Sequence, residues 1–195
     1  MKNDAQEVLR LYQAELVHIR RDLHAHPELG FEETRTAQLV ADKLAEWGVE
    51  VHRGLAKTGV VGTLRRGNAT RSIGLRADMD ALPVVELANV AYKSAVKTKY
   101  NGVETGVMHA CGHDMHTAML MGAAEVLAGL KSQISGTVVF LFQPAEEGLG
   151  GGEAMIKDGL FERFPCDSIF GMHNWPGLSV GKFAIRPGGM MAGGA

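Results

Sequence analysis

The stretch Thr137-Val138-Val139-Phe140-Leu141-Phe142 is apolar after its first residue and rich in β-branched and aromatic side chains. Such runs are typical of interior strands, which are buried on both faces. The segment from Met115 to Leu130, which precedes it, is largely apolar and predicts a buried helix. Together with the alternation of strands and helices along the rest of the chain, this indicates a layered α/β domain.

Amphipathic segments and short apolar runs alternate along the rest of the chain. Apolar residues at spacings of three and four predict helices over residues 4–25 and 32–47, and Gly48 supplies a left-handed residue that ends the second. Another helix is expected to start near Gly152, and Lys97–Gly106 is interpreted as a spacer. Strands are predicted at Val49–His52, Val60–Leu64, Ile73–Ala77, Ser168–Met172 and Leu178–Ile185.

Composition narrows the class of function. The 195 residues allow one substantial core, and 20 basic and 22 acidic residues are well mixed, so no basic stripe suggests nucleic acid. No apolar run reaches the roughly 20 residues that span a bilayer, and the amino terminus lacks an apolar signal core. Two cysteines, Cys111 and Cys166, are too few for a disulfide framework. We expect a cytoplasmic protein that acts on a small molecule.

The segment His109-Ala110-Cys111-Gly112-His113-Asp114-Met115-His116 holds five metal-capable side chains within eight residues. In an extended segment, Cys111 and His113 project to the same side about 6.5 Å apart, so both can reach one ion. Thiolate and imidazole are good ligands for borderline divalent metals. The alternative is a buried cysteine with a histidine that caps the next helix. Crowding then favours supporting or capping roles for His109 and His116.

Two further candidates follow predicted strands, where α/β sites usually lie. Glu146 and Glu147 come just after Pro144 and the strand at 137–142. Neighbouring side chains diverge, so one carboxylate can bind metal while the other acts as general base and then general acid. The alternative is a solvated pair at a helix start. His173 follows the strand at 168–172 and is a third candidate ligand, although a lone histidine is more often structural.

The segment Arg76-Ala77-Asp78-Met79-Asp80 ends another predicted strand. Asp78 or Asp80 could orient a ligand imidazole, and the alternative is a turn stabilised by short acidic side chains. Arg76 has no lone pair for a metal, so a salt bridge or a contact with a substrate carboxylate is expected. The glycine-rich stretch 148–152 lacks the lysine and hydroxyl residue of a phosphate-binding loop.

Taken together, these segments resemble the metal-dependent aminoacylase/carboxypeptidase superfamily, in its hippurate hydrolase and auxin-conjugate amidohydrolase branch. The matching segments are Arg20–His24, Pro27–Gly30, Arg76–Pro83, Met108–Asp114, Gln143–Gly148 and His173-Asn174. The resemblance implies that Cys111, His113, Glu147 and His173 are metal ligands, Glu146 the general base and Asp78 the active-site aspartate. It implies one or two divalent ions, Mn²⁺ or Zn²⁺ first, with Co²⁺ and Ni²⁺ also compatible.

The implied fold is a three-layer α/β/α catalytic domain with a mostly parallel mixed sheet, together with a smaller domain for dimerisation and closure over substrate. Residues 1–187 correspond to the amino-terminal part of that catalytic domain, and 188–195 to a connector. The smaller domain, a later ligand histidine, a histidine for the oxyanion and the last strands have no counterpart here. We therefore expect an incomplete sheet with an unpaired edge, and a homodimer only in full-length members.

Three functions remain open at this point. The first is a metal-dependent amidohydrolase that cleaves N-acyl amino acids such as N-benzoyl or N-acetyl conjugates. The second is an inactive truncated fragment that retains metal binding or pairs with another chain. The third is a thiol hydrolase with Cys111 as nucleophile and a nearby histidine as base.

Overall fold

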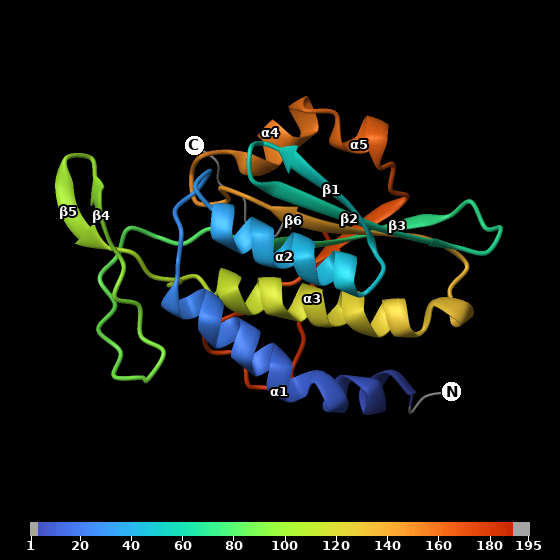
Figure 1. Ribbon diagram of the computed structural model, residues 1–195, viewed down its shortest axis with the longest axis horizontal. Helices are drawn as coiled ribbons and strands as arrows, with labels where there is room; N and C mark the ends of the chain where they lie inside the picture. The colour runs from blue at the N-terminus through green and yellow to red at the C-terminus, as the bar shows by residue number, and fades with distance from the viewer. Residues whose placement is uncertain (1–3, 189–195) are drawn as a thin grey trace.

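The computed structural model of the protein describes residues 4–188 and has three layers, with helices on both faces of a central sheet (Figure 1). The helices are α1 (Asp4–Ala25), α2 (Thr34–Glu46), α3 (His113–Gly129), the short 3-10 helix η1 (Lys131–Gln133), α4 (Gly151–Lys157) and α5 (Leu160–Arg163). The strands are β1 (Glu50–Leu55), β2 (Gly59–Arg66), β3 (Ser72–Asp78), β4 (Lys97–Tyr100), β5 (Val103–Gly106), β6 (Gly136–Gln143) and β7 (Ser168–Gly171).

Five strands form the central sheet in the order β1-β2-β6-β3-β7. β1 pairs with β2 and β2 with β6 in antiparallel fashion, whereas β3 runs parallel to both β6 and β7. The sheet is therefore mixed, as predicted. Because β3, β6 and β7 are parallel to one another, the residues that follow them meet at one edge of the layer, where ligand sites of α/β proteins usually lie.

The central strand β6 separates two apolar cores. Val138 and Phe140 point into the core beneath α1, α2 and α3, while Val139 and Leu141 point into the core beneath α4 and α5. Figure 1 shows α2 and α3 over one face of the sheet and α4 and α5 over the other. A strand covered on both faces needs apolar residues at successive positions, which explains the continuous run from which the fold was predicted.

Most predicted elements are confirmed, with boundaries that shift by at most three residues. Gly48 has the expected left-handed conformation, with a φ of 74°. The strand predicted at Leu178–Ile185 is wrong, because these residues have no regular structure and Val180 and Phe183 are exposed. Alternating apolar residues make a strand only where a neighbouring strand pairs with their backbone, and none among the described residues does so here.

The segment Lys97–Gly106 is not an unstructured spacer. It forms the hairpin of β4 and β5, outside the main sheet. Asn101 and Gly102 at its tip have φ values of 49° and 83°, the conformation that two-residue hairpin turns require. The Asn-Gly pair was therefore a signal for a hairpin that the sequence interpretation missed.

The β7 edge of the sheet has no partner strand within residues 4–188, as expected from the sequence. Ile169 and Phe170 on this strand are exposed. The proposed connector at 188–195 lies outside the described residues except for its first residue, so the boundary at 187 remains a prediction. Across the described part of the chain, no helix combines the length and apolarity that crossing a membrane would need.

The amino terminus of α2 is capped from outside the helix. The Glu28 carboxylate accepts the backbone N–H groups of Arg35 at 2.9 Å and Thr36 at 2.8 Å. We expect Glu28→Ala to lower the free energy of unfolding by about 0.5–2 kcal/mol, the usual cost of losing a cap. Denaturant titration measures this, with exposed Glu32→Ala as the control. Equal losses for the two variants would contradict the capping role.

Glu125 is a buried carboxylate on α3, and its Oε2 atom has no hydrogen-bond partner. Burial, with the nearby charges of Glu15 and Glu46, raises its pKa. A carboxyl with a raised folded-state pKa stabilises the fold at low pH and loses that contribution as pH rises. We therefore expect Glu125→Gln to increase the free energy of unfolding at pH 7. The gain should vanish below about pH 4, where both side chains are neutral. Denaturant titrations across this range would refute this if the two proteins were equally stable throughout.

Candidate metal centre

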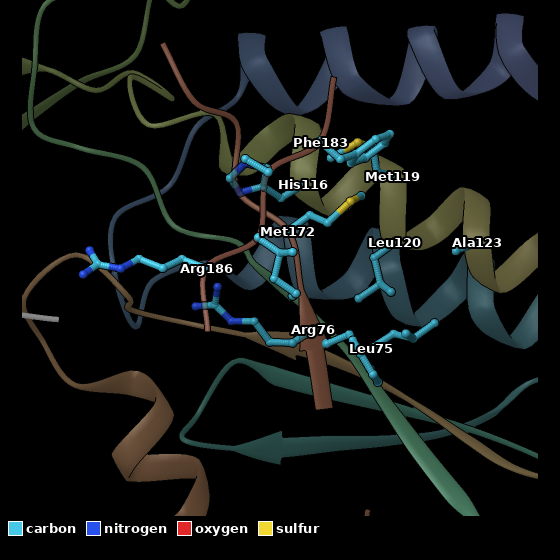
Figure 2. A pocket seen from close by; sticks show the side chains of 13 residues that line it. Leu75, Arg76, His116, Met119, Leu120, Ala123, Met172, Phe183 and Arg186 are labelled. Atoms are coloured by element: carbon cyan, nitrogen blue, oxygen red, sulfur yellow. The ribbon is translucent and has the colours of Figure 1, made fainter. Parts of the chain in front are cut away.

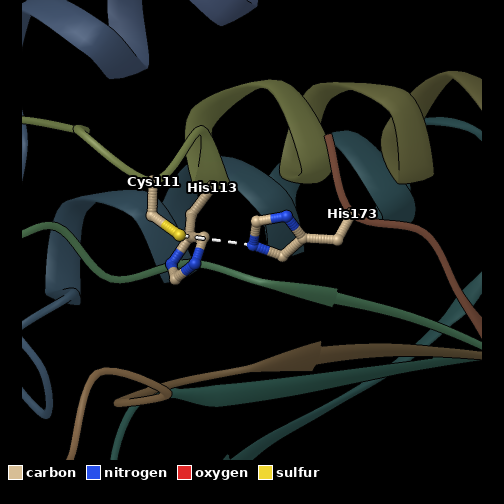
Figure 3. A group of neighbouring side chains, drawn as sticks. All are labelled: Cys111, His113 and His173. Carbon is tan, nitrogen blue, oxygen red and sulfur yellow. Dashed lines mark hydrogen bonds between the residues drawn. The ribbon is translucent and has the colours of Figure 1, made fainter. Parts of the chain in front are cut away.

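Four chain segments meet at the carboxyl-terminal edge of the parallel strands. Asp78 ends β3, Glu146 and Glu147 lie in the loop after β6, and His173 lies just after β7. The fourth segment is the start of α3, which carries His113 in its first turn. Figure 3 shows Cys111 and His113 from this start pointing toward His173 from the other side. Segments far apart in the sequence thus present donor groups to one place.

The donor atoms of the sequence-predicted ligands lie close together. Cys111 Sγ is 3.2 Å from His173 Nε2, and His113 Nε2 is 3.8 Å from Glu147 Oε1. His113 Nε2 is also 3.8 Å from Glu146 Oε2. One donor atom each from Cys111, His113 and His173 lies within 4.8 Å of the others, and the same holds for His113 with the two glutamates. The structure therefore brings together Cys111, His113, Glu147 and His173, with Glu146 beside them.

Hydrogen bonds fix which nitrogen of each imidazole faces this place. His113 Nδ1 donates to the backbone oxygen of Asp80 at 2.8 Å, and His173 Nδ1 donates to the backbone oxygen of Asn174 at 2.7 Å. Both rings therefore present an Nε2 lone pair, as ligand histidines do. His113 Nε2 and Glu147 Oε1 are buried without a hydrogen-bond partner. Two orphaned acceptors beside a thiol and an imidazole fit a divalent ion of the Zn²⁺ or Mn²⁺ kind.

The electrostatics of the site also favour a cation. Burial, followed by the charges of Glu147, Asp78 and Glu146, raises the pKa of the Cys111 thiol to about 12. Burial alone would lower the pKa of His113, but the hydrogen bond that it donates to Asp80 and the charges of the neighbouring acids raise it. Negative charge from these acids contributes to both shifts, and a cation would offset it. A thiol hydrolase would need surroundings that stabilise the Cys111 thiolate, whereas the charged groups acting on Cys111 are carboxylates.

Asp78 is buried and ion-paired. It lies 2.6 Å from an Arg76 guanidinium nitrogen and accepts from His116 Nδ1 at 2.7 Å. Burial opposes its ionisation, but His116 and Arg76 outweigh it and hold the pKa of Asp78 well below the usual range. His116 Nε2 lies 2.7 Å from Asn174 Oδ1 and 3.1 Å from the backbone nitrogen of Asn174. His116 thus connects Asp78 at the end of β3 with Asn174 after β7. It also forms a metal-capable group with Asp78 and His113 among residues 4–188, so its supporting role stays a prediction. Arg76 forms one of the two contacts that the sequence predicted for it.

His109 plays a different part from His116. It is buried, and neither of its ring nitrogens has a hydrogen-bond partner. Burial lowers its pKa to about 4. It belongs to none of the metal-capable groups found among residues 4–188, so direct ligation by His109 has no support.

Asp80 is more central than its sequence context suggested. Its carboxylate accepts the backbone N–H groups of Glu146 at 3.0 Å and Glu147 at 2.9 Å, and Oδ1 lies 3.2 Å from His113 Nδ1. Burial opposes ionisation of Asp80, yet these contacts lower its pKa. One carboxylate therefore orients a candidate ligand and the loop that carries the glutamate pair. A turn stabilised by its own short side chain, the alternative for Asp80, does not describe these contacts.

Gly112 lies between two candidate ligands, Cys111 and His113, and its backbone conformation lets both face the cluster. It has a φ of 93°, which side-chain-bearing residues rarely adopt. A Cβ atom at this position would lie 2.6 Å from Asn174 Oδ1. The glycine therefore turns the chain between Cys111 and His113 and lets Asn174 approach, which keeps the neighbouring His173 next to the cluster.

An apolar groove of about 560 Å³ adjoins the donor cluster (Figure 2). Its walls come from β3, α3, β7 and residues 183–186, and Arg76 and Arg186 are its two basic residues. His116 lines it, but none of the four candidate ligands does. The groove is therefore a neighbour of the candidate centre and not the centre itself.

The fold and the donor set define an α/β protein with a candidate divalent-metal centre at the carboxyl ends of parallel strands. The chain belongs to peptidase family M20/M25/M40, whose sequence pattern matches residues 74–189. The resemblance drawn from the sequence is thereby confirmed at the level of the family.

Its relatives include proteins with stated activities. The chain is 53% identical to hippurate hydrolase of Campylobacter jejuni over 95% of its own length and 46% of that protein. It is 39% identical to N-acetylcysteine deacetylase of Bacillus subtilis, over 94% and 46% of the two chains. A crystal structure from Bacillus subtilis, described as a dinuclear metal-binding peptidase of the M20 family, matches with a TM-score of 0.78 and 39% identity over 88% and 46%. The chain thus spans a little less than half the length of these relatives.

Proposed function

We propose that these residues supply the metal centre and the general base of an amidohydrolase that cleaves N-acyl amino acids. The observation that carries the proposal is that His113 belongs to two metal-capable groups, one with Cys111 and His173 and the other with Glu146 and Glu147. The donors come from separate strand ends and a helix start, so only the fold assembles them.

Cys111, His113, Glu147 and His173 would hold the ion, which we expect to be Mn²⁺ or Zn²⁺. When bound, a divalent cation supplies Lewis-acid activation of water and of the substrate carbonyl. The Glu146 side chain is 41% exposed, against 25% for Glu147, so it has the better access to a substrate. Glu146 would take a proton from the attacking water and then deliver one to the nitrogen that leaves as the amine.

The substrate class is proposed from the relatives. Hippurate hydrolase and N-acetylcysteine deacetylase are both named for substrates in which an acyl group is joined to an amino-acid nitrogen. The common element is the amide of an N-acyl amino acid, which is the bond we propose is cleaved. A reducing compartment such as the cytoplasm would keep the Cys111 thiol available as a ligand.

The test uses the complete natural protein that contains these residues. Its metal content is measured after purification, and turnover is measured on a panel of N-benzoyl and N-acetyl amino acids with Mn²⁺ or Zn²⁺. We expect bound metal and hydrolysis that a chelator abolishes and added metal restores. A protein that takes up no metal, or hydrolysis that survives the chelator and is blocked by thiol alkylation, would overturn the proposal.

One observation favours a second candidate function, that of an inactive fragment which retains metal binding or pairs with another chain. The chain matches only 46% of the length of hippurate hydrolase, so other polypeptide can be required for turnover. Activity of residues 1–195 alone is to be compared with that of the same residues joined to a relative's remaining sequence. Restoration only in the longer protein supports the fragment, and equal turnover excludes it.

A further inference from the structure

The loop that carries the glutamate pair is held by a second buried carboxylate besides Asp80. Three successive backbone N–H groups of this loop donate to carboxylates. Those of Glu146 and Glu147 donate to Asp80, and that of Ala145 donates to Glu33 Oε1 at 2.8 Å. Glu33 lies 112 residues upstream of Ala145 and offers no donor atom to the candidate metal groups.

Glu33 is fully buried, with an exposed fraction of 0%. Its second oxygen, Oε2, accepts the hydroxyl of Thr58, so both carboxylate oxygens have a partner inside the protein. A carboxylate buried this completely is costly to the fold unless its hydrogen bonds are satisfied. These two hydrogen bonds, to the backbone of Ala145 and to the hydroxyl of Thr58, explain how Glu33 can be buried.

Ala145 has a backbone conformation that needs support. Its φ is 50°, in the left-handed region that alanine seldom adopts, and it is completely buried. Such conformations persist where the surrounding structure holds them in place, and they gather at functional sites. The left-handed residue immediately precedes Glu146, so its conformation sets the direction in which the glutamate pair leaves the sheet.

The segment that contains Glu33 also packs against this loop. A Cβ atom on Gly30 would lie 3.1 Å from both Cα and Cβ of Ala145, so the two backbones are in close contact. The same segment reaches the strand end that bears Asp80, because the backbone oxygen of Glu28 accepts the N–H of Ala81 at 2.8 Å. Residues 28–33 therefore touch both loops that build the candidate centre.

We propose that Glu33 is a positioning residue, which holds the loop of Glu146 and Glu147 through the N–H of Ala145. The inference rests on the proposed function, because it has Glu33 position the proposed base Glu146 and the proposed ligand Glu147. Glu33 is completely buried and belongs to none of the metal-capable groups found among residues 4–188. It acts on the reaction only by fixing the backbone from which the two working carboxylates project.

Three variants of the complete natural protein test this role. Glu33→Leu removes both acceptors at similar volume and leaves the N–H of Ala145 without a partner. Glu33→Gln keeps an oxygen for Ala145 and a polar contact for Thr58. Gly30→Ala removes no hydrogen-bonding group, and its Cβ atom would lie 2.9 Å from Leu149 Cδ1 and 3.1 Å from Cα and Cβ of Ala145, so it pushes on the glutamate loop. Gly129→Ala, where a Cβ atom meets nothing within 4 Å, is the matched glycine control, and Ile19→Val in the core controls for lost stability.

Turnover of N-acyl amino acids and the visible absorption of the Co²⁺-loaded protein are the readouts. We expect Glu33→Leu and Gly30→Ala to lower kcat about 10- to 100-fold, the range for groups that support a metal site from outside, and to change the cobalt spectrum. Glu33→Gln should stay within about threefold of the parent, because it retains the acceptor. Gly129→Ala and Ile19→Val should leave kcat and the spectrum unchanged, since neither residue touches the loop.

A folded Glu33→Leu with the parent's kcat and cobalt spectrum would overturn the inference. If Glu33→Leu does not fold, Gly30→Ala is the deciding variant. A Gly30→Ala protein with the parent's kcat and cobalt spectrum would also overturn the inference. If the parent itself hydrolyses no N-acyl amino acid, the proposed function fails. The cobalt spectra of the variants then decide the positioning role separately, because a displaced Glu147 alters the ligand field without any turnover.

Discussion

Glu146→Gln is expected to lower kcat by about 10²- to 10⁴-fold, the usual contribution of a general base. Glutamine has nearly the same shape but cannot take a proton from water. The Glu146 carboxylate lies beside His113, with Oε2 3.8 Å from Nε2, and its side chain is 41% exposed. Because another group is proposed to hold the ion, metal affinity should change by no more than a few-fold.

Glu147→Gln is the matched contrast, since it makes the same chemical change one residue away. Glu147 Oε1 is buried and has no hydrogen-bond partner, as expected for an atom that awaits a cation. This variant should lose metal affinity first, and turnover should recover at high metal concentration. Exposed Glu153→Gln on α4 should alter neither property. Equal turnover in Glu146→Gln and the parent would remove Glu146 from the mechanism.

Cys111→Ala is expected to weaken metal binding by more than about 100-fold, the upper range for groups that only support ligands. A thiolate binds borderline divalent ions strongly, and no other sulfur lies in the candidate groups found among residues 4–188. Burial and the surrounding carboxylates raise the thiol pKa to about 12, so the cation and the thiolate should stabilise each other. Titration of the apoprotein against a competing chelator gives the dissociation constant.

Cys166→Ala is the control, because Cys166 is half-buried like Cys111 but lies two residues before β7 and in none of the metal-capable groups found among residues 4–188. It should bind metal as the parent does. Parental metal affinity in Cys111→Ala, combined with lost turnover, would contradict the ligand role and favour a nucleophilic thiol. Parental values of both would leave Cys111 without a function in the site.

The sequence predicted the layers of the fold because each helix and strand has a local signal. The apolar run around Phe140 requires burial on both faces, and the two cores on either side of β6 supply it. The wrong strand prediction at Leu178–Ile185 has a physical cause. Alternating apolar residues indicate which face of a strand would be buried, but they do not indicate whether a partner strand is present. At Lys97–Gly106 the signal was present in Asn101-Gly102, but the segment was interpreted as a spacer.

The site was predictable wherever a reactive side chain follows a strand. Asp78, Glu146 and His173 were found in this way, and parallel strands bring such positions together. Glu33 could not be found, because an acidic residue just before a helix ordinarily caps it or faces solvent. Its contact with Ala145 joins residues 112 positions apart, and no local pattern reports it. Asp80 was recognised as a candidate, but its hydrogen bonds to the backbone of Glu146 and Glu147 also join distant parts of the sequence, so they could not be predicted.

The most direct test of the metal centre is anomalous X-ray diffraction from crystals of the complete natural protein loaded with Zn²⁺ or Mn²⁺. The account predicts an anomalous peak between Cys111, His113, Glu147 and His173. With Zn²⁺ the peak should lie about 2.3 Å from sulfur and about 2.0–2.2 Å from nitrogen or oxygen donors. A metal peak elsewhere in the protein, or none in crystals soaked at saturating metal, would contradict it.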